Sequence, residues 1–373
     1  MYEAINVLIL FLVTSTNAAS VEKNCVISEF SLVDDVIKNC TDIKISNLHV
    51  PANQGLNLNL KNGTNLVFEG RTYFDYYEWQ GPLITIKGHD LTITGEKGSV
   101  LDGQGELYWD TFGGNGGIAK PKFMRLEVTE SIAERINIKN CPVHCISVKS
   151  NDLIINEWTI DVSEGDKKNF TGHNTDGFDL SGTNLVIKNS TVLNQDDCVV
   201  VNVGANILIS NMVCSGGHGL SISVGFSNDF SANSVSNITF ENCLVSNSPN
   251  GIHVKTHSDS GPGLVHNITY RNIELKNIHN FGINIQQDYE NGEATGNPGS
   301  NIPIVDLTLE NIHGNMQSYN NSPTLEALIL CGEGACTNWQ FSDINITGAK
   351  NGSYCNYQPE GYICPDNSKK IFI

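Results

Sequence analysis

Basic residues are scarce in this sequence. Lys and Arg together number 22, against 40 Asp and Glu, and the formal net charge is -18 at pH 7. Nucleic acids and anionic membrane surfaces are bound chiefly through Lys and Arg, so this balance argues against both as partners. An acidic charge of this kind is common among secreted proteins, where it favours solubility.

Long apolar segments are also scarce. The longest run, Val7–Val13, is too short to cross a bilayer as a helix. Small residues follow it, and Thr16-Asn17-Ala18 fits a cleavage site. We therefore predict that residues 1–18 are a signal peptide, although Glu3 stands where such peptides carry Lys or Arg. The mature protein is expected to be soluble, secreted and extracellular.

No Pro- or Ser-rich linker and no change of composition divides the chain between Cys25 and Cys364. We therefore predict one domain over residues 19–373, whose 39% hydrophobic residues suffice for a long core. Helical periodicity is nearly absent as well. Short alternating strands fill the chain instead, which favours an all-β fold.

The eleven cysteines agree with an oxidising compartment. Close spacing predicts local disulfides at Cys25–Cys40, Cys198–Cys214, Cys331–Cys336 and Cys355–Cys364. Cys141, Cys145 and Cys243 remain without an assigned partner, and the odd total leaves at least one thiol unpaired within the chain. Sequons for N-glycosylation occur at Asn39, Asn62, Asn169, Asn189, Asn237, Asn267, Asn320, Asn345 and Asn351.

A weak repeat organises the strands. One unit reads apolar-x-apolar-x-Asn, a second strand begins a few residues later, and successive second strands start 21 to 32 residues apart. This period is too short for βαβ units and too long for hairpins, and it suits one coil of a parallel β-helix with three short strands. Asn suits a repeated bend because it tolerates a left-handed φ, and its amide can bond the Asn of the next coil. The units end at Asn140, Asn189, Asn211, Asn242, Asn272 and Asn311.

The second strand tests this interpretation, because its alternate residues should face the core. They are apolar in every coil: Ile146, Phe178, Val199, Leu220, Ile252 and Ile283, then Val148, Leu180, Val201, Ile222, Val254 and Ile285. The outward columns read Ser147, Asp179, Val200, Ser221, His253 and Asn284, then Lys149, Ser181, Asn202, Ser223, Lys255 and Gln286. Just before the strand stand His144, Asp176, Asp197, His218, Asn250 and Phe281. Since neighbouring coils stack about 4.8 Å apart, we predict one exposed face shared by Asp176, Asp197, His218, His253 and Lys255.

Asp196 adds a third carboxylate beside Asp197. Like charges this close raise the pKa of at least one carboxyl, so one group can act as a general acid while an ionised one activates water. Glycosidic-bond hydrolysis has this requirement, whereas a plain acidic surface and a Ca²⁺ site are the alternatives. His218 lies between two glycines that let a substrate approach, and its pKa should be raised beside the carboxylates. Lys255 and His253, one coil beyond His218, suit an anionic ligand, and the aromatic ring of Tyr289, one coil later, suits the lining of a sugar site.

These residues lie in motifs that resemble the polygalacturonases of glycoside hydrolase family 28, especially the fungal-type endo-acting enzymes. The likeness runs from about Cys25 to Cys364. The motifs at the site are Asn174-Thr175-Asp176-Gly177-Phe178-Asp179, Asn194-Gln195-Asp196-Asp197-Cys198, Ser215-Gly216-Gly217-His218-Gly219-Leu220-Ser221, Asn250-Gly251-Ile252-His253-Val254-Lys255-Thr256 and Gln286-Gln287-Asp288-Tyr289.

The resemblance implies a single right-handed parallel β-helix and an inverting, endo-acting hydrolysis of the α-1,4-galacturonosyl linkages of polygalacturonate. It implies Asp196 as the general acid, Asp176 and Asp197 as the groups that activate water, and His218 as the residue that tunes the acid. The implied substrate-binding residues are Lys255, which would hold a galacturonate carboxylate, Tyr289, His253 and Asn174. No metal or organic cofactor is implied. Pectin is the expected partner, with a plant inhibitor protein as a second one, and the expected state is a monomer.

Three departures from the family pattern leave an alternative open. His253 stands where the family has Arg, the stretch Leu220–Gly225 is one residue short, and Val203 replaces a common Ser. A weakened relative that binds pectin fragments or an inhibitor protein is therefore the second hypothesis, and a Ca²⁺-dependent pectate lyase is the third. If a charged His253 assists binding, activity should fall as the pH rises through about 6–7.

Overall fold

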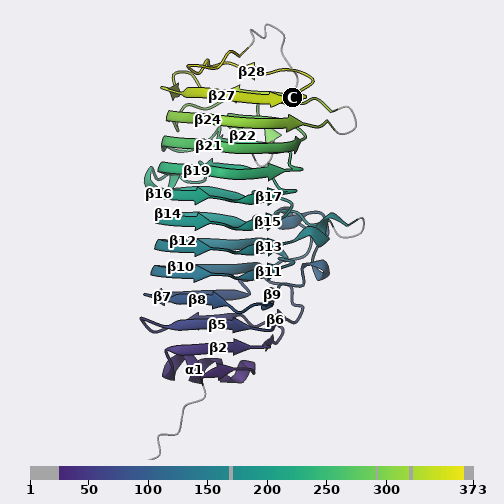
Figure 1. The fold of residues 1–373 in the computed structure, drawn as a ribbon, viewed down its shortest axis with the longest axis vertical. Coiled ribbons are helices and arrows are strands. Elements are labelled where there is room, and N and C mark those ends of the chain that lie inside the picture. The colour runs from purple at the N-terminus through teal and green to yellow at the C-terminus, as the bar shows by residue number, and fades with distance from the viewer. Residues whose placement is uncertain (1–24, 168–170, 291–292, 319–321, 365–373) are drawn as a thin grey trace, which may run out of the picture.

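The computed structural model describes residues 25–364 apart from 168–170, 291–292 and 319–321. The expected signal peptide, residues 1–18, lies outside the described residues. The described chain winds into a right-handed parallel β-helix, as predicted, and its 28 strands join in one sheet. Figure 1 shows the coils stacked along one axis, from helix α1 (Val33–Asn39) at the N-terminal end to β27 (Gln340–Thr347) near the other end.

The coils place their strands in three parallel rows. The first row carries the predicted second strands and the functional side chains. It consists of β4 (Leu56–Asn59), β7 (Ile84–His89), β10 (Lys122–Glu134), β12 (Val143–Asn156), β14 (Phe178–Lys188), β16 (Val199–Ser210), β18 (Leu220–Val224), β20 (Asn250–His257), β22 (Phe281–Glu290), β25 (Leu325–Leu330) and β28 (Tyr354–Cys355).

Long strands bend from the first row into the second, so β10, β12, β14 and β16 belong to both. The other members of the second row are β1 (Val26–Ile27), β2 (Asp42–Ser46), β5 (Asn65–Glu69), β8 (Thr92–Gly95), β19 (Ser234–Ser246), β21 (Leu264–Ile278), β24 (Ile304–Met316), β26 (Cys336–Thr337) and β27. The third row holds β3 (His49–Val50), β6 (Arg71–Phe74), β9 (Val100–Asp102), β11 (Asn137–Lys139), β13 (Thr159–Asp161), β15 (Thr191–Leu193) and β17 (Val213–Ser215).

Short elements complete the connections between coils. The two-residue strand β23 (Glu293–Ala294) pairs antiparallel with β22. Single 3-10 turns occur at η1 (Phe30–Leu32), η2 (Gly105–Leu107), η3 (Gly113–Asn115), η4 (Ser163–Asp166) and η5 (Ser231–Asn233). Among the described residues, no helix is long and apolar enough to cross a membrane.

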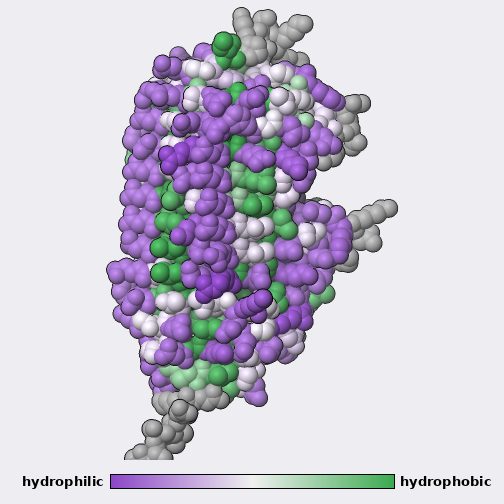
Figure 2. All heavy atoms as spheres, viewed as in Figure 1, coloured by the Kyte–Doolittle hydropathy of each residue, from purple (hydrophilic) through white to green (hydrophobic). Residues whose placement is uncertain are grey.

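The predicted register is confirmed in the core columns. The strands β12, β14, β16, β18, β20 and β22 align Ile146, Phe178, Val199, Leu220, Ile252 and Ile283 across six coils. All twelve predicted core residues have exposed fractions of 0%. Because equivalent positions stack in this way, polar and apolar residues form long stripes parallel to the axis, which Figure 2 shows in purple and green on one face.

One outward column departs from its predicted register. Ser181 pairs with Val203 and not with Asn202, because the register shifts by one residue after the Leu180–Val201 pair. This β-bulge puts an extra residue into β16. Asn202 was therefore wrongly placed in the column of Lys255, whereas the Ser223–Lys255 and Lys255–Gln286 pairs are confirmed.

The predicted Asn bends are also confirmed. Each of the six residues Asn140, Asn189, Asn211, Asn242, Asn272 and Asn311 has a φ between 50° and 56°. Side-chain amides link neighbouring coils, with Asn211 Nδ2 donating to Asn189 Oδ1 at 3.0 Å and Asn272 Nδ2 donating to Asn242 Oδ1 at 2.9 Å. Asn311 donates to Asn272 at 2.7 Å. The bends therefore stabilise both the corner of each coil and the stacking of coils.

We expect Asn272→Ala to lower the free energy of unfolding by about 1–3 kcal/mol, because a left-handed residue with a Cβ is strained and two exposed amide hydrogen bonds are lost. Asn272→Gly loses the same hydrogen bonds but tolerates the φ of 55°. It should therefore be the more stable of the two variants. Urea denaturation followed by circular dichroism measures both, and equal losses would show that backbone conformation at the bend contributes nothing.

The four predicted disulfides are present. Two of the cysteines without an assigned partner form a fifth, Cys141–Cys145, which closes the turn before β12. Cys243 is the unpaired cysteine of the described chain, and its side chain is buried within β19. Burial raises the pKa of this thiol to about 12, so it remains protonated and unreactive at neutral pH.

Candidate active site

The three carboxylates lie at the beginning of first-row strands on two adjacent coils. Asp176 precedes β14, Asp196 and Asp197 precede β16, and His218 precedes β18 on the next coil. The three Asp residues are only 7%, 6% and 3% exposed, respectively. The prediction of an exposed face was therefore wrong for Asp176 and Asp197, and it was also wrong for the buried His253 and Lys255. Coils that stack about 4.8 Å apart bring long side chains into mutual contact, and these side chains cover one another's atoms.

Each of the three carboxylates has its own cationic neighbour. His218 Nδ1 lies 3.0 Å from Asp196 Oδ1, and Lys255 Nζ lies 2.9 Å from Asp197 Oδ2. His144 Nδ1 lies 3.5 Å from Asp176 Oδ1. Buried charges are stable only when they are paired or hydrogen-bonded, so these contacts explain how three acids can share one site.

The pairing divides the carboxylates electrostatically. Burial, followed by the charge of Asp196, raises the pKa of Asp176 well above its ordinary value. Burial acts in the same direction on Asp196, but the charge and the hydrogen bond of His218 outweigh it and lower the pKa of Asp196. The prediction that crowding raises at least one carboxyl pKa is confirmed. Of these two carboxyls, Asp176 is therefore the one that holds a proton more readily.

His218 also behaves as predicted. Burial lowers its pKa, but the charge of Asp196 more than compensates and raises the pKa to about 9. The ring is thus an imidazolium at neutral pH, and its Nδ1–H points at Asp196. The glycines beside it have a structural role: a Cβ on Gly217 would lie 2.0 Å from the carbonyl oxygen of Asp196. A side chain at that position would push His218 away from its carboxylate.

Neutral side chains fix the geometry of the carboxylates. The Asn194 amide donates to the carbonyl oxygens of Thr175, Asp196 and Asp197 at 2.9, 2.9 and 3.0 Å. Asn174 Nδ2 donates to Asp196 Oδ2 at 3.1 Å, which puts this predicted substrate-binding residue in contact with the acid. Ser221 Oγ donates to Asp197 Oδ1 at 2.5 Å.

Three of the four predicted binding residues, Lys255, His253 and Tyr289, lie on the C-terminal side of the carboxylates. Lys255 is 5% exposed, and its ammonium lies 5.0 Å from the centroid of the Tyr289 ring. Burial lowers the pKa of Lys255, but the charge of Asp197 outweighs this and raises it. Lys255 is therefore a permanent cation that contacts Asp197 and leaves further donors on its ammonium for an anionic group.

His253 differs from its prediction. Burial and the charge of Lys255 lower its pKa well below the ordinary value, so the ring is neutral. Neither ring nitrogen makes a well-directed hydrogen bond, although the Gln286 side chain favours the charged form slightly. The expectation that activity falls as the pH rises through about 6–7 loses its basis here, because a neutral ring has no charge to lose there.

The shortened stretch leaves β18 in register. Leu220 to Val224 pair with Ile252 to Thr256 without a shift, so the missing residue does not disturb the strand. The chain then turns at Gly225, whose φ is 115°, and presents Phe226 with 69% of its surface exposed. The Phe226 ring packs at 4.3 Å from the His257 ring, between centroids.

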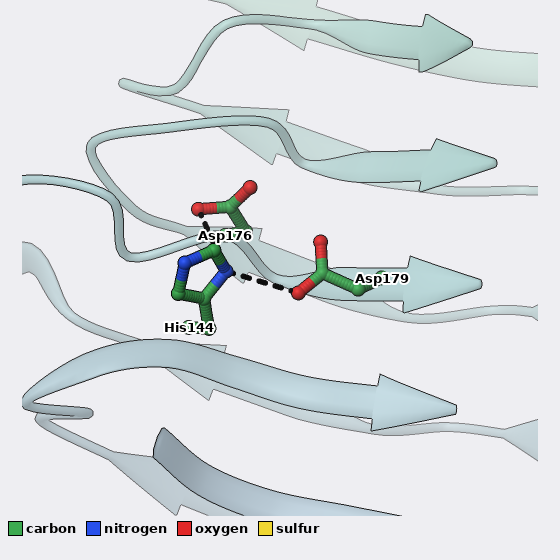
Figure 3. Close-up of side chains that lie close together, drawn as sticks. All are labelled: His144, Asp176 and Asp179. Carbon is green, nitrogen blue, oxygen red and sulfur yellow. Dashed lines mark hydrogen bonds and ion pairs between the residues drawn. The ribbon is translucent and has the colours of Figure 1, made fainter. Parts of the chain in front are cut away.

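Two side chains that contact the site were given no role in the sequence analysis. His144 Nδ1 lies 3.0 Å from Asp179 Oδ2, so Asp179 and Asp176 share one imidazole (Figure 3). Both residues stood in the predicted columns without a role. The signal was available, because His144 begins the column that contains Asp176, Asp197 and His218.

Within the described ranges, two groups have donor atoms close enough for a metal ion: His144 with Asp176 and Asp179, and His218 with Asp196 and Asp197. In both groups the imidazole already forms an ion pair with a carboxylate. Both histidines have a pKa of about 9, and a proton on the ring competes with a metal ion for the same nitrogen. The geometry is that of ion-paired acids more than of a metal centre.

Comparison with known proteins decides the family. The model of the glycosyl hydrolases of family 28 matches residues 40–364. The chain belongs to this family. A polygalacturonase of Phaedon cochleariae is 48% identical over 92% of this chain and 94% of its own length. Endopolygalacturonase A of Aspergillus niger is 46% identical over 91% of this chain and 90% of its own length. The structure of endopolygalacturonase I from Stereum purpureum, complexed with two galacturonates, superposes on this chain with a TM-score of 0.78 at 29% sequence identity. The superposition covers 91% of this family 28 chain and 100% of the Stereum purpureum chain.

Proposed function

We propose that this protein is a polygalacturonase that hydrolyses the α-1,4-galacturonosyl linkages of polygalacturonate in pectin and cleaves within the chain. The observation that carries the proposal is the set of three buried carboxylates, each next to its own cation, in a member of family 28. Glycoside hydrolysis needs one protonated and one ionised carboxyl group. The pKa shifts alone favour a proton on Asp176 over one on Asp196, so the role of Asp196 as the acid rests on its contact with the proton-donating His218.

In the proposed reaction Asp196 donates a proton to the leaving glycosidic oxygen. Its proton comes from His218, whose charged Nδ1–H is 3.0 Å from Asp196 Oδ1. Asp176 and Asp197 take a proton from the attacking water, which enters from the opposite face of the sugar ring and inverts the anomeric carbon. The proton gained by these carboxylates balances the proton lost from the Asp196–His218 pair, and exchange with solvent restores the site.

Substrate binding is proposed for Lys255, Tyr289, Asn174 and His253. The ammonium of Lys255 would hold the carboxylate of one galacturonate while it remains paired with Asp197. The neutral His253 can form only a single hydrogen bond in place of a charged, two-point contact. Loss of such a contact costs roughly 1.5–3 kcal/mol, or about ten- to a hundredfold in rate. A weakened relative that binds pectin fragments or an inhibitor protein is therefore the second candidate.

The release of reducing ends from polygalacturonate tests the proposal. We expect oligogalacturonates of mixed length and no absorbance at 235 nm, with or without a chelator, because a lyase would leave an unsaturated product. His253→Arg should raise kcat/KM about tenfold or more if the lost contact limits the rate. Retained binding of polygalacturonate without reducing ends would favour the second candidate.

We also propose that the protein acts outside the cell as a monomer, after removal of residues 1–18. Five disulfides in the described chain support an oxidising compartment. Asn62 and Asn351 are exposed sequons suited to glycosylation. A plant inhibitor protein is the second proposed partner, besides pectin.

A further inference from the structure

His144 contacts two carboxylates with one ring nitrogen. It lies in β12, whereas Asp179 lies in β14 and Asp176 precedes that strand, so the contact joins two adjacent coils. The Nδ1 atom lies 3.0 Å from Asp179 Oδ2 and 3.5 Å from Asp176 Oδ1, and Figure 3 shows the ring between the two acids. The His144 side chain is 27% exposed, compared with 10% for Asp176 and 16% for Asp179.

The charged surroundings of His144 favour the imidazolium. Burial lowers its pKa and Lys122 of β10 acts in the same direction, but Asp176 and Asp179 outweigh both and raise the pKa to about 9. On the loop side, Gly114 faces Nε2 and adds no charge: a Cβ built on Gly114 would lie 3.9 Å from it. His144 therefore carries a positive charge throughout the acidic and neutral pH range.

Asp176 depends on this charge more than the other two acids do. Burial and the charges of Asp196, Asp179 and Asp197 all raise its pKa, and His144 is the neighbour that lowers it. Lys255 and His218 are engaged with Asp197 and Asp196 instead. In the described part of the chain Asp176 Oδ1 accepts no hydrogen bond of good geometry, so His144 acts on it through its charge.

We propose that His144 is a positioning residue whose charge, next to Asp176, favours the ionised form of that carboxyl and thereby makes it more available to activate the attacking water. Asp179 assists by holding Nδ1–H, which fixes the ring next to Asp176. The inference rests on the proposed hydrolytic function for its catalytic meaning. The electrostatic part of the inference, that the charge of His144 favours the ionised form of Asp176, does not depend on that function.

The acid limb of the pH profile tests the catalytic part. Activity rises with pH as the base loses its proton, and an opposite charge within about 4–6 Å lowers a carboxyl pKa by about 1–3 pH units. His144→Gln removes the charge, so the acid limb of kcat/KM should move to higher pH by about one to three pH units. At a fixed pH on the original limb, activity should fall about tenfold for every pH unit by which the limb moves, while most of it returns at higher pH.

His266→Gln is the matched control, because His266 Nε2 pairs with Asp306 Oδ2 at 2.9 Å on β21 and β24, in another row of strands. It should leave the acid limb unmoved. A uniform loss of activity in His144→Gln at every pH, with the limb in its original place, would overturn the proposal and assign His144 a merely structural role.

A direct titration separates this inference from the proposed function. Protein labelled at the aspartate side-chain carboxyl carbons is titrated by NMR, and Asp176→Asn identifies the Asp176 signal. The midpoint of that signal should rise by about one to three pH units in His144→Gln, whether or not the protein hydrolyses polygalacturonate. An unchanged midpoint would overturn the inference. A wild type that releases no reducing ends would overturn the proposed function alone.

Discussion

Asp196→Asn should lower kcat for polygalacturonate hydrolysis by about 10²–10⁴-fold, the usual contribution of a general acid. The amide occupies the same volume and can keep the contact with Asn174, but it has no proton to give to the leaving oxygen. KM should change little, because Lys255 and Tyr289 are untouched. Steady-state kinetics on polygalacturonate measures both constants.

A substrate with an activated leaving group distinguishes the acid from the base. An aryl glycoside of an oligogalacturonate needs little protonation, so Asp196→Asn should recover much of its activity on it, whereas Asp176→Asn should not. Asp306→Asn, which removes an exposed carboxylate paired with His266, is the control and should retain wild-type activity. If Asp176→Asn were the variant rescued by the aryl substrate, the roles of the two carboxylates would be exchanged, in line with the raised pKa of Asp176.

The periodic part of the fold could be predicted from the sequence because it obeys two simple rules. Side chains alternate along a strand, and coils stack at a fixed spacing, so a residue's column follows from its distance to the strand start. Ile146 and Phe178 were placed in one core column in this way. The same rules brought Asp176, Asp197 and His218 together although more than forty residues separate the first from the last.

The features that could not be predicted depend on local interactions, which the alignment of residues into columns does not describe. The bulge beside Asn202 adds one residue to β16 and leaves no trace in the apolar pattern. The Cys141–Cys145 disulfide joins the turn after Asn140 to β12, and the apolar pattern does not mark these two cysteines as partners. The bond between His144 and Asp179 depends on side-chain rotamers, because the two residues occupy different columns.

Ionisation was the least predictable property of the site. His218 and His253 both lie near carboxylates and Lys255, and their positions in the repeat predict similar surroundings for the two rings. The His218 ring directly contacts Asp196, which raises its pKa to about 9. The His253 ring is deeply buried and is affected more by Lys255 than by any acid, so its pKa falls. The sign of each pKa shift depends on contacts of a few ångström, which cannot be derived from the column in which a residue lies.

Lys255→Met should destabilise the fold by about 3–5 kcal/mol, because it leaves Asp197 as a buried charge without its partner. The side chains of Lys255 and Asp197 are only 6% and 4% exposed, so water cannot replace the lost cation. Lys44→Met is the matched control. Its ion pair with Glu69 is 40% and 42% exposed, and its loss should cost about 0–1 kcal/mol.

The double variant Lys255→Met/Asp197→Asn separates charge from packing. It removes both charges of the pair. The amide oxygen that replaces the carboxylate can still accept the hydrogen bond from Ser221. The double variant should therefore regain most of the stability lost in Lys255→Met. Neither variant should hydrolyse polygalacturonate, because the restored fold lacks both the cation for the substrate and one of the two water-activating carboxylates. Urea denaturation and reducing-end assays measure the two properties. If the double variant were as unstable as Lys255→Met, the lost stability would come from packing around the lysine stem. Asp197 would then be stable in the site without a cation.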